Sequence, residues 1–310
     1  MVFGGPGFLS ISFFKECDGD LGVVKANKSV SLSITWKGET FMKFIVIPPY
    51  RAGQYTSTGG HYMVVELIAN MREKGQLEGI EVDIDDGFPV EDTEGRRDEE
   101  VLAIISAGLL QRAKMYCGGD KYDAILTSGG IEPGFTALRM MSKIPVAGSV
   151  HSAVHAASLI GDRFAVIHKN DPTALIVRRL VKSYGFDHKL TSVRYIGHSS
   201  PSMQAIFRAH KKGEREKTPE GKKFIDDITT QCFAAIEEDR VDSLIFGDPP
   251  FQCLHDEIRK RLDSKGYAEI PIVCALSAAV EMAKTMVNLK LMQAPRAYPS
   301  DALKAKPKFR

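Results

Sequence analysis

The segment Asp123-Ala-Ile-Leu-Thr-Ser-Gly129 has a counterpart 119 residues later, Asp242-Ser-Leu-Ile-Phe-Gly-Asp248. Each segment runs from an aspartate through apolar residues into a loop. Two further matched pairs keep the same order along the chain, and these are Phe44-Ile-Val-Ile with Phe164-Ala-Val-Ile and Ile144-Pro-Val-Ala with Ile270-Pro-Ile-Val. The order of three strands, and nearly their spacing, is therefore repeated. The repeat predicts two similar α/β lobes with a site in the cleft between them, where Gly129 and Asp248 end equivalent strands.

Outside these segments the chain alternates short Val- and Ile-rich strands with helices. Strands are expected at about 43–48, 80–85, 123–128, 144–147, 163–168, 190–196, 242–247 and 270–273. Helices are expected at about 58–75, 97–117, 134–142, 149–160, 172–184, 200–212, 218–239, 251–265 and 274–291. Strands that are apolar on both faces are typical of parallel sheets covered by helices. The predicted fold class is α/β, with two pseudo-symmetric lobes that each hold a parallel sheet flanked by helices.

The same pattern predicts how the chain is divided. Residues 1–41 lack a helical period and precede the first repeated strand, so they are expected to form an extension of uncertain order. Lobe 1 is expected to comprise residues 42–147 and 274–292, and lobe 2 residues 148–273. Residues 293–310 form a basic, Pro-containing tail, for which a frayed terminus is the expected structure.

Composition excludes several classes of function. Of the 310 residues, 44% are apolar and 26% charged, which is ordinary for a globular protein with two domains. The net charge of +2 does not favour nucleic acid or a membrane surface as a partner. No apolar run reaches the length of a membrane span, and no signal peptide is evident. The five cysteines are scattered without a CxxC pair, so a reduced, cytoplasmic location is expected, with no disulfide framework or zinc site.

Ligands of parallel sheets bind at the carboxyl ends of the strands, which directs attention to the loops of the first lobe. After the first strand, Tyr50 and Arg51 precede a small polar run that opens a helix, where a carboxylate or phosphate could bind. The alternative is that Arg51 is a solvated loop residue. After the third strand come Thr127, Ser128, Gly129 and Gly130, which let the backbone approach a ligand closely or merely form a tight turn.

The loops of the second lobe offer titratable side chains. His168 follows the fifth strand as a candidate acid or base, although packing is an alternative role, and Asn170 follows two residues later. Asp248 stands between Gly247 and Pro249 as a candidate general base, with a helix cap as its alternative role. His151 and His155 have the spacing of a metal pair but lack a companion acidic motif, so no metal site is predicted.

Residues 43–290 resemble the aspartate/glutamate/hydantoin racemase superfamily, most clearly its hydantoin racemase branch. Asp123 to Gly134 is similar to that branch's strand and its Cys-x-Gly-Asp-Pro-Gly loop, and Ile144-Pro-Val-Ala-Gly and Gly161-Asp-Arg-Phe-Ala-Val-Ile are similar to the segments that follow. Phe246-Gly247-Asp248 is similar to the strand that ends in the second Gly-Cys motif. The resemblance implies two pseudo-symmetric lobes, a cofactor-independent reaction on a small carboxylate or carbonyl compound, and a homo-oligomer.

The resemblance also implies a catalytic cysteine from each lobe, one on each face of the substrate's α-carbon. In a gap-free alignment these positions are Gly129 and Asp248, and neither is a thiol. The superfamily also includes arylmalonate decarboxylases and maleate isomerases, and a single acid or base suits such one-sided chemistry. Three hypotheses follow: a lyase or isomerase with Asp248 as acid/base, a racemase that uses another base such as His168 or Glu132 opposite Asp248, and a non-catalytic binding protein.

Overall fold

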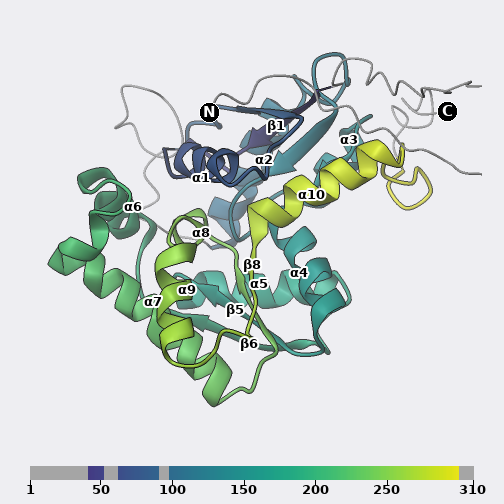
Figure 1. Ribbon diagram of the computed structural model, residues 1–310. Helices are drawn as coiled ribbons and strands as arrows, with labels where there is room; N and C mark the ends of the chain where they lie inside the picture. The colour runs from purple at the N-terminus through teal and green to yellow at the C-terminus, as the bar shows by residue number, and fades with distance from the viewer. Residues whose placement is uncertain (1–40, 52–61, 91–97, 300–310) are drawn as a thin grey trace, which may run out of the picture. The chain divides into compact units, whose positions relative to one another are not determined.

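The computed structural model describes residues 41–51, 62–90 and 98–299, all within one compact unit that begins at Phe41. The expected N-terminal extension lies almost wholly outside these residues, as does the end of the C-terminal tail. Two four-stranded parallel sheets with flanking helices confirm the predicted fold class (Figure 1). Within the described residues, no helix combines the length and apolar character needed to cross a membrane.

The first sheet has the strand order β2-β1-β3-β4. Its strands are β1 (Met42–Ile47), β2 (Ile80–Ile84), β3 (Ala124–Thr127) and β4 (Val146–Ala147). The helices between these strands are α1 (Tyr62–Glu73), α2 (Glu99–Ala113) and α3 (Phe135–Met141).

The second sheet repeats this topology as β6-β5-β7-β8. Its strands are β5 (Phe164–His168), β6 (Leu190–Tyr195), β7 (Ser243–Phe246) and β8 (Ile272–Cys274). The remaining helices are α4 (Ser149–Ile160), α5 (Asp171–Ser183), α6 (Ser200–Ala209), α7 (Pro219–Glu237), α8 (Pro249–Cys253), α9 (His255–Ser264) and α10 (Ala275–Asn288), with a short 3-10 helix at Arg215–Lys217. All eight expected strands are therefore present. One expected helix, 251–265, is wrong as a single element, because Leu254 leaves the helical conformation at φ −99° and ψ 12° and separates α8 from α9.

The aspartate that begins each repeated segment has a structural role. In the first lobe, Asp123 Oδ2 accepts a hydrogen bond from the backbone N–H of Lys43 at 2.9 Å, and the Asp123 N–H donates to the Lys43 carbonyl at 2.7 Å. In the second lobe, Asp242 Oδ2 accepts from the N–H groups of Asp162 and Arg163 at 2.8 and 2.9 Å. Each aspartate thus ties the third strand of its sheet to the start of the first strand, which sets the register of the two neighbouring strands.

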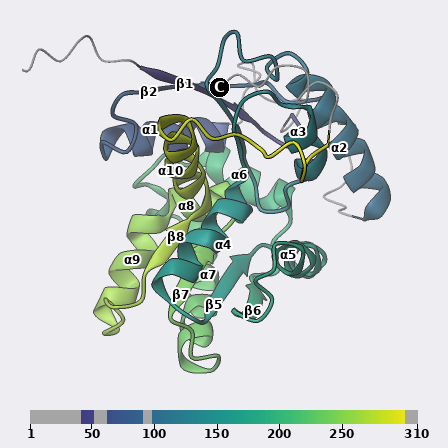
Figure 2. The same ribbon diagram turned by 90° about the vertical axis from the view of Figure 1, so that its right-hand side faces the viewer.

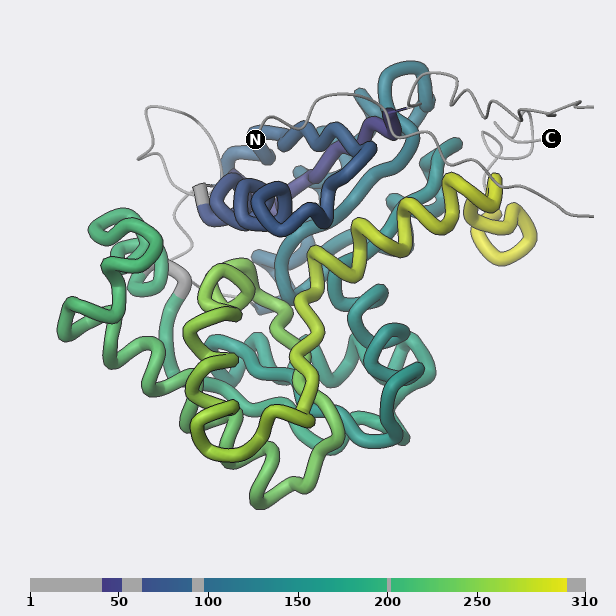
Figure 3. Tube along the Cα trace, in the orientation of Figure 1, coloured from purple at the N-terminus to yellow at the C-terminus, as the bar shows by residue number. Residues whose placement is uncertain are grey.

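Two helices cross between the sheets (Figures 2 and 3). Helix α4 follows β4 of the first sheet but packs against β7 and β8 of the second, whereas α10 follows β8 but packs against β3 and β4. The two helices also pack against each other. The largest apolar cluster accordingly joins residues of both sheets, such as Leu126 and Phe246. The division into lobes at the expected residue bounds stays a prediction.

An ionic clasp holds α1 against the segment that follows α6. The guanidinium of Arg215 makes two 2.6 Å hydrogen bonds to the carboxylate of Glu66 and lies 3.9 Å from the ring centroid of Phe207. Lys212 Nζ lies 2.9 Å from the carboxylate of Glu73. We call the Arg215–Glu66 and Lys212–Glu73 pairs the α1 clasp. Because Arg215 is buried and Lys212 is not, only the first pair is shielded from water.

Glu132 anchors the loop after β3 to the start of α4. Its carboxylate accepts hydrogen bonds from the N–H groups of Val150 at 2.9 Å and His151 at 3.1 Å, and from the hydroxyl of Tyr184 at 2.5 Å. A carboxylate at a helix N-terminus is favoured by the free N–H groups there. Burial nevertheless raises the pKa of Glu132 to about 7, against the effect of these donors.

Replacing Arg215 by Ala should lower the free energy of unfolding by about 2–3 kcal/mol, because a largely buried carboxylate loses its partner. The matched variant Lys212→Ala removes an exposed ion pair and should cost at most about 1 kcal/mol. Urea denaturation measures both. Equal losses in the two variants would contradict the role assigned to the buried half of the clasp.

Replacing Glu132 by Ala should lower the free energy of unfolding by about 2–4 kcal/mol, since it leaves three donors without their acceptor. Tyr184→Phe removes one donor only and should cost less. Glu132 should also contribute less to stability as pH rises from about 4.5 to 7, whereas the lowered pKa values of His151 and His168 act in the opposite direction. The raised pKa of Glu132 means that this group binds more protons in the folded state than in the unfolded chain in this range. The difference in unfolding free energy between the parent and Glu132→Ala should therefore shrink across this range, and a constant difference would contradict the assignment to Glu132.

Candidate active site

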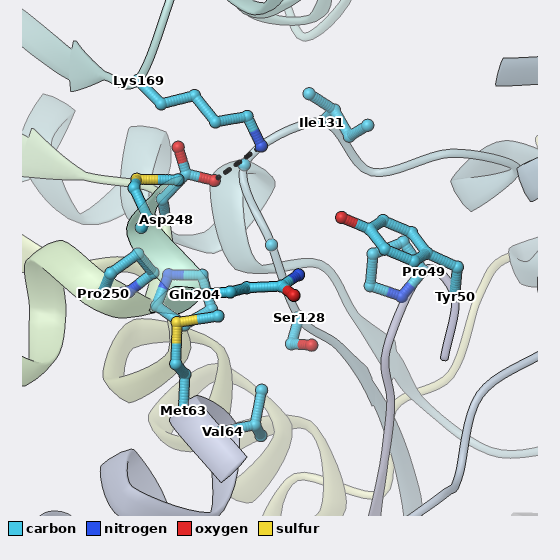
Figure 4. Close-up of a pocket in the computed structure, with 14 residues that line it drawn as sticks. Pro49, Tyr50, Met63, Val64, Ser128, Ile131, Lys169, Gln204, Asp248 and Pro250 are labelled. Carbon is cyan, nitrogen blue, oxygen red and sulfur yellow. Dashed lines mark ion pairs between the residues drawn. The ribbon is translucent and has the colours of Figure 1, made fainter. Parts of the chain in front are cut away.

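A pocket that is partly open to solvent lies where strand ends of the two sheets face each other (Figure 4). Six of the residues predicted from the sequence line it, and these are Tyr50, Ser128, Gly129, Gly130, Asp248 and Pro249. The first four come from the loops after β1 and β3, and the last two are the N-cap and the first residue of α8, which follows β7. The structure thus brings together residues that are about 200 positions apart in the chain.

The second lobe supplies a buried carboxylate with two nitrogen-bearing neighbours. Asp248 follows β7 and is 4% exposed. Because β5 pairs with β7, the end of β5 lies beside it, and His168 Nε2 is 3.3 Å from Asp248 Oδ2. Lys169 Nζ approaches Asp248 Oδ1 at 3.7 Å (Figure 4). A carboxylate in this position can exchange a proton with a bound ligand while a nearby cation offsets its charge.

The first lobe presents backbone to this carboxylate. A Cβ atom at Gly130 would lie 2.3 Å from His168 Nε2 and 3.2 Å from Asp248 Oδ1, so only glycine permits this approach. Gly129 has φ +96°, a conformation that L side chains rarely adopt. Ser128 lines the pocket, and its hydroxyl oxygen is buried without a hydrogen-bond partner among the described residues. A buried hydroxyl of this kind is suited to bind a polar group of a ligand.

Other predicted residues lie behind the pocket surface rather than on it. His168 is fully buried beside Asp248, and Asn170 caps α5 by accepting a hydrogen bond from the Thr173 N–H. The Gly247 carbonyl accepts from Gln252 Nε2 at 3.0 Å. Arg51 donates its backbone N–H to the Phe88 carbonyl at 2.7 Å and, like Thr127, is not among the lining residues. Direct ligand contacts by these residues therefore stay predictions.

Two groups of lining residues were missed by sequence reasoning. Lys169 lines the pocket and directly follows His168 at a strand end, so its position in the sequence could have identified it as a site residue. Met63 and Val64 of α1 (Figure 4) form an apolar part of the lining together with Met203 of α6. No pattern in the sequence links α1 to α6, because the two helices meet only through the tertiary structure.

The four described cysteines lie outside the lining of this pocket. Cys117 and Cys232 belong to apolar clusters, and Cys253 donates its thiol to the Met63 carbonyl at 3.4 Å. Burial raises the pKa of Cys117 to about 11 and that of Cys274 to about 12. In the part of the chain that the structure describes, no cluster of three His, Cys, Asp or Glu side chains is arranged to hold a metal ion.

Comparison with known proteins identifies relatives of this chain. Residues 61–283 match the family model described as Asp/Glu/Hydantoin racemase. Over 167 residues the chain is 26% identical to a hydantoin racemase of Pseudomonas sp. (strain NS671), covering 54% of this chain and 59% of that protein. Over 166 residues it is 26% identical to a hydantoin racemase of Rhizobium meliloti, covering 54% of this chain and 61% of that protein. The chain therefore spans about three fifths of the length of these curated relatives.

Among solved structures, allantoin racemase from Pseudomonas fluorescens superimposes with a TM-score of 0.65 at 21% identity, covering 87% of this chain and 100% of that one. At this identity the likeness concerns the fold, and function must be argued from the site. The family model, in contrast, spans most of the sequence. The chain belongs to the Asp/Glu/hydantoin racemase family.

Proposed function

We propose that this protein is a cofactor-independent lyase, decarboxylase or isomerase of the family, which acts on a small carboxylate or related carbonyl compound through an enolate-like intermediate. Asp248 is the proposed acid/base. The observation that carries the proposal is the one-sided site: a buried carboxylate flanked by His168 and Lys169 faces the backbone of Gly130, and Gly129 lines the same pocket. Proton transfer from one face suits decarboxylation, bond cleavage or tautomerisation more than inversion at carbon.

The other groups of the pocket receive roles that follow from their chemistry. The hydroxyl of Ser128 and the backbone at Gly129 and Gly130 are placed to hold the carboxylate or carbonyl oxygen on which negative charge develops. Met63 and Met203 offer an apolar surface to a substituent on the reacting carbon. Lys169 offsets charge on Asp248 during proton transfer.

The state of the cysteines supports acid/base chemistry by a carboxylate. We infer that Gly129 and Asp248 stand where the two-thiol racemases of the family carry their cysteines. The thiolate is the reactive form of cysteine, and burial disfavours it at Cys117, Cys253 and Cys274 by raising their pKa values. None of these thiols lines the pocket.

One observation favours a racemase with bases other than cysteine as a second candidate. The phenol of Tyr50 projects into the pocket from the first lobe, opposite the side that Asp248 occupies (Figure 4). A proton donor there would complete a two-sided site. His168 does not fit this role because it lies beside Asp248, and Glu132 does not because its oxygens bind the start of α4.

Asp248→Asn should abolish turnover, with a fall in kcat of about 100-fold or more, because the amide cannot exchange the proton. The measurement is turnover of a panel of arylmalonates, maleate and 5-substituted hydantoins by parent and variant. Asp256→Asn is the matched control, since that carboxylate lies outside the pocket and should be replaceable without effect. A parent-like rate for Asp248→Asn would exclude the carboxylate as acid/base, and tight binding of panel compounds without turnover would favour a binding protein.

Reaction in D₂O separates the two candidates. For a substrate with a stereogenic α-carbon, a one-sided enzyme should place deuterium in one enantiomer only, as read by chiral separation and mass spectrometry. Tyr50→Phe should then keep the stereochemical outcome. Deuterium in both enantiomers, together with loss of one of them in Tyr50→Phe, would instead support the two-sided racemase.

A further inference from the structure

A chain of buried polar groups leads away from Asp248 toward the start of α5. His168 Nδ1 lies 2.7 Å from the hydroxyl oxygen of Thr173. That hydroxyl lies in turn 2.6 Å from Asn170 Oδ1 and 2.9 Å from the Asn170 carbonyl. His168 and Thr173 are fully buried, so water does not replace these contacts. None of the roles described above requires Thr173.

The direction of each hydrogen bond follows from counting protons. A threonine hydroxyl carries one proton, and both nearby Asn170 oxygens are acceptors only. Asn170 Oδ1 is identified as the amide oxygen because it also accepts from the Thr173 N–H. The hydroxyl proton therefore points to Asn170, and the lone pair of the Thr173 oxygen faces the imidazole. His168 Nδ1 must then carry a proton and donate it to Thr173.

This tautomer leaves a lone pair on Nε2 of the neutral ring, facing Asp248 Oδ2 at 3.3 Å. Burial lowers the pKa of His168 to about 4, and Lys169 acts in the same direction, while Asp248 and the Gly130 backbone oppose it. Two acceptors at this distance repel each other unless a proton lies between them. One proton on either the carboxyl oxygen or Nε2 satisfies both atoms.

We propose that Thr173 is a positioning residue that fixes His168 as the Nδ1–H tautomer, so that His168 and Asp248 hold a single shared proton beside the pocket. The use of this proton in catalysis rests on the proposed function, whereas the tautomer does not. The charged and titratable groups that face the ring are Asp248 and Lys169.

The shared proton provides a balanced step in the proposed reaction. The Asp248 O–H bond breaks as a C–H bond forms at the enolate-like carbon, and the electron pair left on oxygen makes Asp248 a carboxylate. This carboxylate faces the Lys169 ammonium group at 3.7 Å, which offsets its charge. Once Asp248 has lost its proton, its carboxylate is repelled by the lone pair of His168 Nε2. The reverse transfer, from carbon to Asp248, is therefore favoured and takes place on the same face of the substrate.

The test is ¹⁵N NMR of protein labelled at histidine, with His168→Gln used to assign the His168 signals. The parent should show Nδ1 protonated near neutral pH, whether Nε2 is bare or holds the proton that it shares with Asp248. Thr173→Val, which lacks the acceptor oxygen, should shift the ring toward the Nε2–H tautomer, and Thr173→Ser should retain the parent tautomer. A parent ring in the Nε2–H form, or a Thr173→Val ring that keeps the Nδ1–H form, would overturn the proposal. The parent spectrum decides this even where the valine variant does not fold.

Kinetics separate this inference from the proposed function. With a substrate of the proposed class, Thr173→Val should lower kcat roughly tenfold or more and displace one limb of the pH–rate profile. Thr173→Ser should keep the kcat and the pH–rate profile of the parent. Unchanged pH profiles in both variants would overturn the catalytic use of the shared proton. If NMR shows the predicted tautomers but no compound is turned over, the positioning role of Thr173 is supported and the proposed function is refuted.

Discussion

A carboxylate removed from water must be compensated by its surroundings, and much of the architecture around Asp248 meets this requirement. The pairing of β5 with β7 brings His168 and Lys169 beside it. The loop after β3 approaches so closely that residue 130 has to be glycine. Glu132 holds that loop against α4, and Gln252 holds the Gly247 carbonyl on the opposite side. These contacts place an ionisable group at the junction of two sheets without leaving it exposed.

The two sheets share the contacts that determine the fold, but they differ at the residues of the candidate site. Asp123 and Asp242 each bind the backbone at the start of the first strand of their sheet. Helices α4 and α10 each follow one sheet and pack against the other. The equivalent strand ends differ, since one offers the bare backbone of Gly129 and the other the carboxylate of Asp248. A repeated fold therefore need not carry a repeated reaction, which is why function is argued from the site.

The sequence predicts this fold well because its determinants are local. Runs such as Phe44-Ile-Val-Ile and Phe164-Ala-Val-Ile are short, apolar and bounded by loops, so strand positions can be assigned from pattern alone. Strand-end residues such as Ser128 and Asp248 could be predicted because parallel strands present their carboxyl ends at one edge. The break at Leu254 was missed because both sides of it continue a helical pattern.

The remaining parts of the site depend on distant contacts. Met63 and Met203 line one pocket from helices α1 and α6, and the proposed proton arrangement of His168 depends on Thr173 and Asn170 in three dimensions. The most direct test of the central claim is a crystal structure with a bound substrate or analogue. The account predicts the reacting carbon about 3–3.5 Å from the Asp248 carboxylate, with its other face against the backbone of Gly129 and Gly130. A protonatable side chain such as Tyr50 in contact with that second face would contradict it.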